Sequence, residues 1–229
     1  MPPDGEQEDA HYLGHRERLR ERFLTAGPDS LQDYEMIEVL LWPIPRRDTK
    51  PMAKKLLEEF GDLWGIVNAP QDRLKAHGLT DAAMTSILMV GAAALRMARQ
   101  RIMDKPVLSS WQLVIDYCMG AMALEPVEHF RLLFLDRRHT LIADEVQQRG
   151  TIDHTPVYPR EVIKRAIALG ATAVILVHNH PTGDPTPSHA DIDMTREIMR
   201  CGQPLGIAVH DHLIVSKGGY VSFKTRQLI

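Results

Sequence analysis

The first part of the chain carries apolar residues at the three- and four-residue spacing of helices. Between residues 14 and 103 these residues recur on one face of each segment, and each segment stops at a glycine or a proline. Leu31–Trp42, for example, ends at Pro43. Residues 1–10 are acidic and polar, show no such pattern and are expected to be disordered. The pattern therefore predicts an all-helical domain over residues 11–104.

The second part of the chain alternates between strand and helix patterns. Ala173–Val177 is an unbroken apolar run, which is typical of a strand buried on both faces. A helical pattern over Pro159–Leu169 leads into it, and two paired strands are expected between residues 130 and 150. A late hairpin closes the chain. This order predicts a mixed α/β (α+β) domain over residues 105–229.

Composition and charge narrow the class of protein. The 229 residues are 44% hydrophobic and 25% charged, which is ordinary for a globular chain. The net charge of −3 argues against a protein that coats nucleic acid through bulk positive charge. The mixed run His15–Arg22 fits either a solvated helix face or a phosphate-binding patch, and the alternation with glutamate favours the solvated face.

Cysteine usage and hydropathy bear on the compartment. Cys118 and Cys201 are the only cysteines, they lie far apart, and no C-x-x-C motif occurs. We therefore expect a reducing, cytoplasmic compartment without structural disulfides. No apolar stretch is expected to reach the ~20 residues of a membrane-spanning helix, so no membrane partner is expected. The missing C-x-x-C and H-E-x-x-H motifs also exclude a zinc deaminase and a zincin.

Two histidines and an aspartate carry the candidate chemistry. His178 and His180 follow the buried run, and strand alternation places both side chains on one face. A proline- and glycine-rich loop follows, and Ser188 can begin a helix whose first turn contains Asp191. Three such ligands with room for a water are typical of a catalytic zinc site. Ser188 and Asp191 also fit an ordinary capping box, which alone would explain both.

The same residues match a family motif. Residues 178–191 have the sequence HNHPTGDPTPSHAD, which resembles the JAMM motif of JAB/MPN metalloproteases, H-x-H-P-x-G followed by S-x-x-D. More narrowly, the chain resembles the RadC family, because Tyr158–Val162 matches its P-R-E-V element and residues 205–223 match its closing strands. The resemblance is tight from about Ser109 to the C-terminus. It implies a JAB/MPN (cytidine-deaminase-like) mixed-sheet domain after an N-terminal helix-hairpin-helix-like domain.

The resemblance also implies a function. A JAMM-type, zinc-dependent hydrolase would hold one Zn²⁺ per chain on His178, His180 and Asp191. Metal-activated water would attack an amide, peptide or isopeptide bond of a protein or peptide substrate. Two alternatives stay open at this point: a DNA-associated accessory protein in repair or recombination, and an MPN scaffold without turnover. Assembly into a homo-oligomer also stays open.

A catalytic glutamate and a serine complete the implied site. The JAMM pattern supplies a general-base glutamate from the first strand after the opening helix of the domain. Glu128 is preferred because it lies directly before that strand, and Glu125, Glu145 and Glu161 are the alternatives. Ser188 is expected to donate its hydroxyl to the developing oxyanion.

Three further features leave alternatives open. Strand alternation is expected to bring His210 and His212 together, either in a second metal site or, as we prefer, in support of the first. Asn179 would face away from the ligands and hold the loop. Residues 76–81 resemble a helix-hairpin-helix, but the turn has one glycine and Asp81 stands where a DNA phosphate would dock. A structural role is therefore favoured over a DNA clamp.

Overall fold

The computed structural model describes residues 5–45, 48–149 and 157–229. Residues 1–4, 46–47 and 150–156 lie outside that description, as do the side chains of residues 5–13, 148 and 149. Gly150, expected at the end of a strand, therefore falls outside the described residues. The chain divides into two compact units, Met1–Ala94 (unit 1) and Leu95–Ile229 (unit 2).

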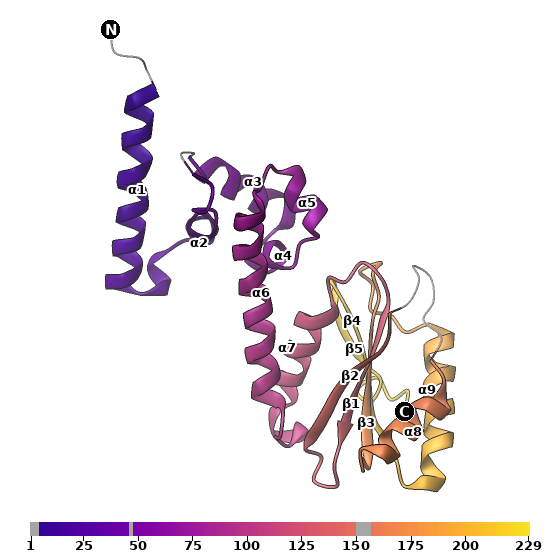
Figure 1. Ribbon diagram of the computed structural model, residues 1–229. Helices are drawn as coiled ribbons and strands as arrows, with labels where there is room; N and C mark the ends of the chain where they lie inside the picture. Colours follow the sequence, from indigo (N-terminus) through magenta and orange to yellow (C-terminus); the bar gives the residue numbers. More distant parts are fainter. Residues whose placement is uncertain (1–4, 46–47, 150–156) are drawn as a thin grey trace. The chain divides into compact units, whose positions relative to one another are not determined.

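Unit 1 is built from helices (Figure 1). They are α1 (Gly5–Ala26), the short 3-10 helix η1 (Pro28–Ser30), α2 (Asp33–Leu40), α3 (Lys50–Phe60), α4 (Leu63–Val67), α5 (Gln71–Ala76) and the first part of α6 (Asp81–Ile102). The apolar faces of α2 to α6 meet in one core, whose fully buried members include Ile37, Leu56, Ile66, Leu74 and Ile87. The helical N-terminal part predicted from the sequence is confirmed.

The turn between α5 and α6 contains the glycine that the sequence places between the two helices. Gly78 adopts a φ of 78°, a left-handed conformation that glycine tolerates without steric cost. The hydroxyl of Thr80 then accepts a hydrogen bond from the Ala83 N–H at 3.3 Å and caps the start of α6. The segment that resembles a helix-hairpin-helix is thus a short glycine turn between two helices.

Two expectations about the helices are corrected by the structure. Residues 5–10, which we expected to be disordered, form the first turns of α1, because extending a formed helix is much easier than starting one. In addition, α6 is long and apolar enough, by length and composition alone, to cross a membrane, with a mean hydropathy of 1.3 and 22% of the window buried. The expectation that no stretch reaches this length is wrong, although soluble proteins contain helices that pass the same test.

The helix α6 continues from unit 1 into unit 2. Ile102 is buried in the core of unit 2, and Ala98 packs against that core. Arg99 donates from Nε to the Asp144 carboxylate at 2.9 Å. These contacts explain why unit 2 begins at Leu95, whereas the sequence placed the boundary between residues 104 and 105.

Unit 2 is a mixed sheet with helices on both faces (Figure 1). Its strands are β1 (His129–Leu135), β2 (Leu141–Arg149), β3 (Ala173–Asn179), β4 (Ala208–Ser216) and β5 (Gly219–Ser222). They lie in the order β2-β1-β3-β4-β5, with β3 and β4 parallel and the other neighbours antiparallel. One face is covered by α7 (Trp111–Met122), and the other by α8 (Pro159–Ala168) and α9 (His189–Gly202). The 3-10 helices η2 (Val107–Ser110) and η3 (Gln203–Leu205) precede α7 and follow α9. This architecture confirms the mixed α/β fold class.

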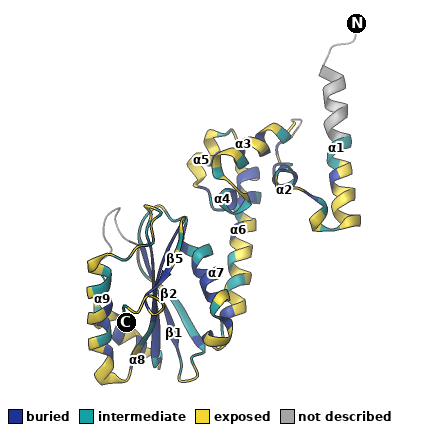
Figure 2. Ribbon diagram, turned by 180° about the vertical axis from the view of Figure 1, so that it is seen from behind, coloured by how far each residue is buried: buried dark blue, intermediate teal, exposed yellow. Residues whose placement is uncertain are grey.

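The central strand β3 is buried along its whole length. Ile175 and Val177 pack in the core that α7 covers, whereas Val174 and Leu176 pack in the core under α8 and α9. Figure 2 shows the buried centre of the sheet between more exposed helices. Because both cores hold β3, the polar residues at its end have a rigid support.

Candidate metal centre

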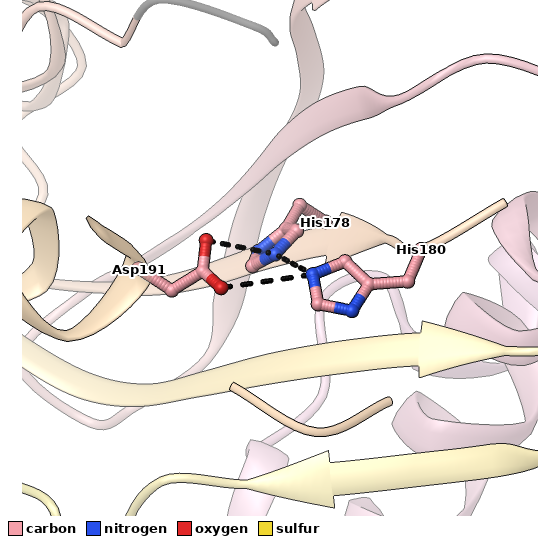
Figure 3. A group of neighbouring side chains, drawn as sticks. All are labelled: His178, His180 and Asp191. Carbon is pink, nitrogen blue, oxygen red and sulfur yellow. Dashed lines mark hydrogen bonds and ion pairs between the residues drawn. The ribbon is translucent and has the colours of Figure 1, made fainter. Parts of the chain in front are cut away.

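The end of β3 and the start of α9 bring three candidate ligands together. His178 is the last residue but one of β3, and His180 follows the strand directly. Asp191 is the third residue of α9, whose N-cap is Ser188. Figure 3 shows the two imidazole rings and the carboxylate pointing toward one another. The sequence predicted this grouping from strand alternation and helix capping.

The distances between the donor atoms suit one small cation. The Nε2 atoms of His178 and His180 lie 3.0 Å apart. The Asp191 carboxylate lies 3.2 Å from Nε2 of His178 and 3.6 Å from Nε2 of His180. Tetrahedral zinc with bonds of 2.0–2.1 Å separates its ligands by roughly 3.3 Å. The three donors therefore fit a tetrahedral ion that keeps a fourth position for water.

The site is covered on one side and partly exposed to solvent on the other. His178 is buried, while His180 and Asp191 are half-buried. Nδ1 of His180 lies 2.8 Å from the backbone carbonyl of Asp184. Since a carbonyl can only accept, Nδ1 of His180 carries the hydrogen and its Nε2 lone pair faces the other donors. The loop after β3 thus orients His180 for coordination through Nε2.

The electrostatics favour an ionised aspartate. Burial by itself would raise the pKa of Asp191, but the hydrogen bonds that protonated His178 and His180 can donate, together with that of Ser188, outweigh it and hold that pKa far below its usual range. The hydrogen bond that the protonated form of His180 can donate to Asp191 raises the pKa of His180, against the opposing effect of burial. The carboxylate is therefore charged at neutral pH, as a metal ligand must be.

Ser188 is hydrogen-bonded to the candidate ligand. Its hydroxyl donates to the Asp191 carboxylate at 2.6 Å and accepts from the Asp191 N–H at 3.1 Å. The Ser188 N–H also donates to this carboxylate, at 2.7 Å. The capping box that the sequence allowed is thus formed. The oxyanion role of Ser188 stays a prediction.

The candidate general bases differ in their surroundings. Glu128 lies directly before β1, and its charge contributes to the raised pKa of His180, so its field reaches the site. Glu145 instead forms an ion pair with Arg165. Glu161 lies in the first turn of α8 and pairs with basic neighbours of its own helix. Glu128 remains the preferred base, and its role stays a prediction.

Asn179 faces away from the ligands, as expected, and it holds the segment that precedes β1. Its side chain is fully buried. Oδ1 accepts from the His129 N–H at 2.7 Å, and Nδ2 donates to the carbonyls of Val127 and Glu125 at 3.0 and 3.3 Å. The segment that carries Glu128 is therefore fixed to the strand that carries the two histidines.

The expectation that His210 and His212 lie together is wrong. Val209 pairs with Val174 and Asp211 pairs with Ile175, so His210 is an extra residue in β4 and the strand bulges there. The rings of Trp111 and His139 lie beside His210, and burial lowers the pKa of His210.

His212, in contrast, lies behind the candidate metal centre. It is fully buried, and its Nε2 lies 2.8 Å from Nδ1 of His178. Within the described residues, no other group of three His, Cys, Asp or Glu side chains could hold a metal ion. The support role for His212 is thus compatible with the geometry, and a second metal site at this pair is not formed.

Sequence reasoning missed two residues that contact the ligands or their support. Thr195 on α9 places its hydroxyl 2.6 Å from Nδ1 of His212. Phe130 on β1 stacks against His178, with ring centroids 6.2 Å apart and an interplanar angle of 18°. The only local signal was the position of Thr195, one helical turn after Asp191. Phe130 lies opposite His178 through the pairing of β1 with β3, which no local pattern reveals.

Comparisons with known proteins agree with this fold. Residues 108–228 match the family model of the RadC-like JAB domain, so unit 2 is a domain of the JAB class. A UPF0758 protein of Rhodobacter capsulatus is similar to this chain, with 53% identity over 213 residues that cover 92% of this chain and 100% of the relative. The chain therefore belongs to the RadC family. The resemblance found in the sequence is confirmed.

Proposed function

We propose that this chain is a zinc-dependent hydrolase of the JAMM type, acting on an amide, peptide or isopeptide bond of a protein or peptide substrate. One observation carries the proposal: His178, His180 and Asp191 converge at distances that suit a tetrahedral ion, with one side of the site open. Nitrogen and oxygen donors of this kind suit Zn²⁺. When bound, the ion lowers the pKa of a water to about 7 and polarises a carbonyl.

Three residues around the ligands would supply proton transfer, stabilisation of the oxyanion and positioning of the base. Glu128 would take a proton from the attacking water and return it to the leaving amine. Ser188 would turn its hydroxyl from Asp191 toward the oxygen of the substrate carbonyl as negative charge develops there. Asn179 keeps the segment of Glu128 in place through its three hydrogen bonds.

The proposed compartment is reducing and cytoplasmic. Both cysteines are free, with Cys118 buried and Cys201 exposed. A free, exposed thiol is typical of proteins in reducing compartments, which supports the proposal.

Zinc content and hydrolysis, measured together, test the proposed function. The purified chain should bind one zinc ion and cleave peptide or isopeptide substrates. His178→Ala should lose both zinc and activity, whereas Glu128→Gln should keep zinc and lose activity. His210→Ala is the matched control, because this imidazole lies on the same sheet outside the ligand group.

Each outcome has a defined meaning. A wild-type chain that binds no zinc would overturn the hydrolase. Zinc binding without turnover on a broad panel of peptide and isopeptide substrates would leave the non-catalytic scaffold. Full activity in Glu128→Gln would remove Glu128 from the role of base and direct attention to Glu125.

A further inference from the structure

A chain of buried side chains lies behind His178, on the side opposite the candidate metal. Nδ1 of His178 lies 2.8 Å from Nε2 of His212. Nδ1 of His212 lies 2.6 Å from the hydroxyl of Thr195, which in turn donates to the backbone carbonyl of Asp191 at 2.6 Å. His212 and Thr195 are both fully buried. Three elements, β3, β4 and α9, thus meet in one hydrogen-bonded chain that starts and ends at candidate ligands.

Counting hydrogen atoms fixes the direction of every bond in this chain. A carbonyl only accepts, so the single hydroxyl hydrogen of Thr195 goes to Asp191. The Thr195 oxygen must therefore accept from His212, which places the hydrogen of neutral His212 on Nδ1. Nε2 of His212 is then an acceptor, and His178 donates to it from Nδ1.

These bond directions determine the state of Nε2, the other ring nitrogen of His178. A neutral imidazole with its hydrogen on Nδ1 has a lone pair on Nε2. Nε2 is the atom of His178 that faces Nε2 of His180 and the Asp191 carboxylate. The direction of three buried hydrogen bonds thus selects the tautomer of His178 that can bind a cation.

We propose that Thr195 and His212 are positioning residues that hold His178 in its metal-binding tautomer and tie its ring to the first turn of α9. The inference rests on the proposed metal centre and adds a specific role for two residues outside the ligand set. Partners of this kind, which orient a metal-binding histidine, typically change metal affinity 10–100-fold when removed.

Packing alone is the competing explanation for both residues. The His212 ring lies beside the rings of Phe223 and Phe130, with centroid separations of 4.4 and 6.1 Å. A residue that only filled this space could be replaced by another aromatic ring without a loss of zinc affinity. The two explanations therefore predict different results for variants that keep the volume and remove the hydrogen bonds.

The first experiment compares zinc affinity in matched variants of the full chain, using a chelating competitor. Thr195→Val removes the hydroxyl and keeps the volume, while Thr195→Ser keeps the hydroxyl. Without the hydroxyl, His212 is free to move its hydrogen to Nε2, which would push the hydrogen of His178 onto its own Nε2. Thr195→Val and His212→Phe should weaken zinc binding about 10-fold or more, and Thr195→Ser should bind like wild type.

The second experiment needs no variant. Long-range ¹H–¹⁵N correlation spectra of the metal-free wild-type chain should show His178 and His212 with hydrogen on Nδ1. Hydrogen on Nε2 of His178 overturns the inference, even if the variants fail to fold. Equal zinc affinity in wild type, Thr195→Val and His212→Phe overturns it as well. A wild-type chain that shows these tautomers and binds no zinc overturns the proposed function instead.

Discussion

The two units of this chain use buried polar groups in different ways. In unit 1, the buried carboxylates Glu35 and Glu38 face Arg22 and His15 of α1 respectively. Each pair joins α1 to α2 and extends no further than those helices. Because buried ion pairs can often be replaced by apolar contacts of similar volume, we expect such replacements to leave the architecture of unit 1 unchanged.

In unit 2, four buried polar residues lie around the end of β3 and the start of α9. Asn179, Thr195, Asp211 and His212 are each at most 1% exposed. The Asp211 carboxylate accepts hydrogen bonds from the Ser222 hydroxyl and from the backbone N–H groups of Lys224 and His212. These bonds fix the bulged strand that carries His212. The other three hold the ligand strand, the first turn of α9 and the segment of Glu128.

The buried polar groups of unit 2, unlike those of unit 1, lie beside the candidate ligands. A buried polar group costs free energy unless its hydrogen bonds are made, and a satisfied network is rigid. In unit 2, Asn179, Thr195, Asp211 and His212 all make hydrogen bonds near the end of β3, whereas the core of unit 1 is apolar. Substitutions in unit 2 should therefore affect zinc binding as well as stability, whereas substitutions in unit 1 should affect stability alone.

The largest expected difference is the response to zinc. At a zinc concentration about 100 times Kd, wild-type unit 2 should gain about 2.7 kcal/mol in its free energy of unfolding. His178→Ala and Asp191→Asn remove a ligand and should gain close to nothing. Thermal unfolding with and without zinc measures the gain, and hydrogen exchange locates it. A similar gain in unit 1, or in His178→Ala, would contradict a zinc centre at these residues.

A second comparison sets two asparagines against each other. Asn179→Leu should lower the free energy of unfolding of unit 2 by about 3 kcal/mol, because it leaves a buried N–H and two carbonyls without partners. Asn68→Ala in unit 1 should cost about 1 kcal/mol, because Asn68 is half-buried and donates one bond, to the Trp64 carbonyl. Urea unfolding followed by hydrogen exchange separates the two. Equal losses would show that Asn179 has no special place in the network.

Two glycines, one in each unit, allow a steric test of the same difference. A Cβ on Gly218 would lie 2.5 Å from the carbonyl oxygen of Gly183. Gly183 belongs to the loop that joins His180 to Asp191. A Cβ on Gly91 would lie 2.7 Å from the Val67 carbonyl in unit 1. Each alanine variant should lose about 1–3 kcal/mol, but only Gly218→Ala should also weaken zinc binding. Unchanged zinc affinity in Gly218→Ala would mean that the loop does not help to place the ligands.

The smallest expected effect concerns acid and unit 1. Burial would raise the pKa of Glu35, but the hydrogen bond and charge of Arg22 and the Gln32 N–H lower it below 4.5. A lowered pKa means that ionised Glu35 stabilises the fold above pH 4.5, and that this contribution disappears as the pH falls through the folded value. Glu35→Gln should therefore lose on the order of 1 kcal/mol at neutral pH and little in acid.

Unfolding free energies measured across this pH range check the sign. Glu58→Gln, on the exposed side of α3, is the matched control and should change stability little. A larger loss for Glu35→Gln in acid than at neutral pH would contradict the assignment. The zinc response of unit 2 should be the same in both variants.

Much of the fold and part of the candidate site could be predicted because the signals are local. Glycine and proline mark the ends of the helices, and the apolar run Ala173–Val177 marks the central strand. His178, His180 and Asp191 lie within 14 residues, so one strand exit and one helix start suffice to bring them together. The DNA-associated role, the oligomeric state and the substrate remain predictions.

The amino-acid sequence was enough to predict the element types, the two-part order of the chain and the ligand triplet, since each depends on spacing over a few residues. Only the tertiary structure places His212 against His178 and turns His210 away, because the parallel pairing of β3 with β4 and the bulge in β4 set that register. It also decided that Asn179 holds the segment of Glu128. Contacts across strands depend on register between distant segments, and no short-range pattern encodes that register.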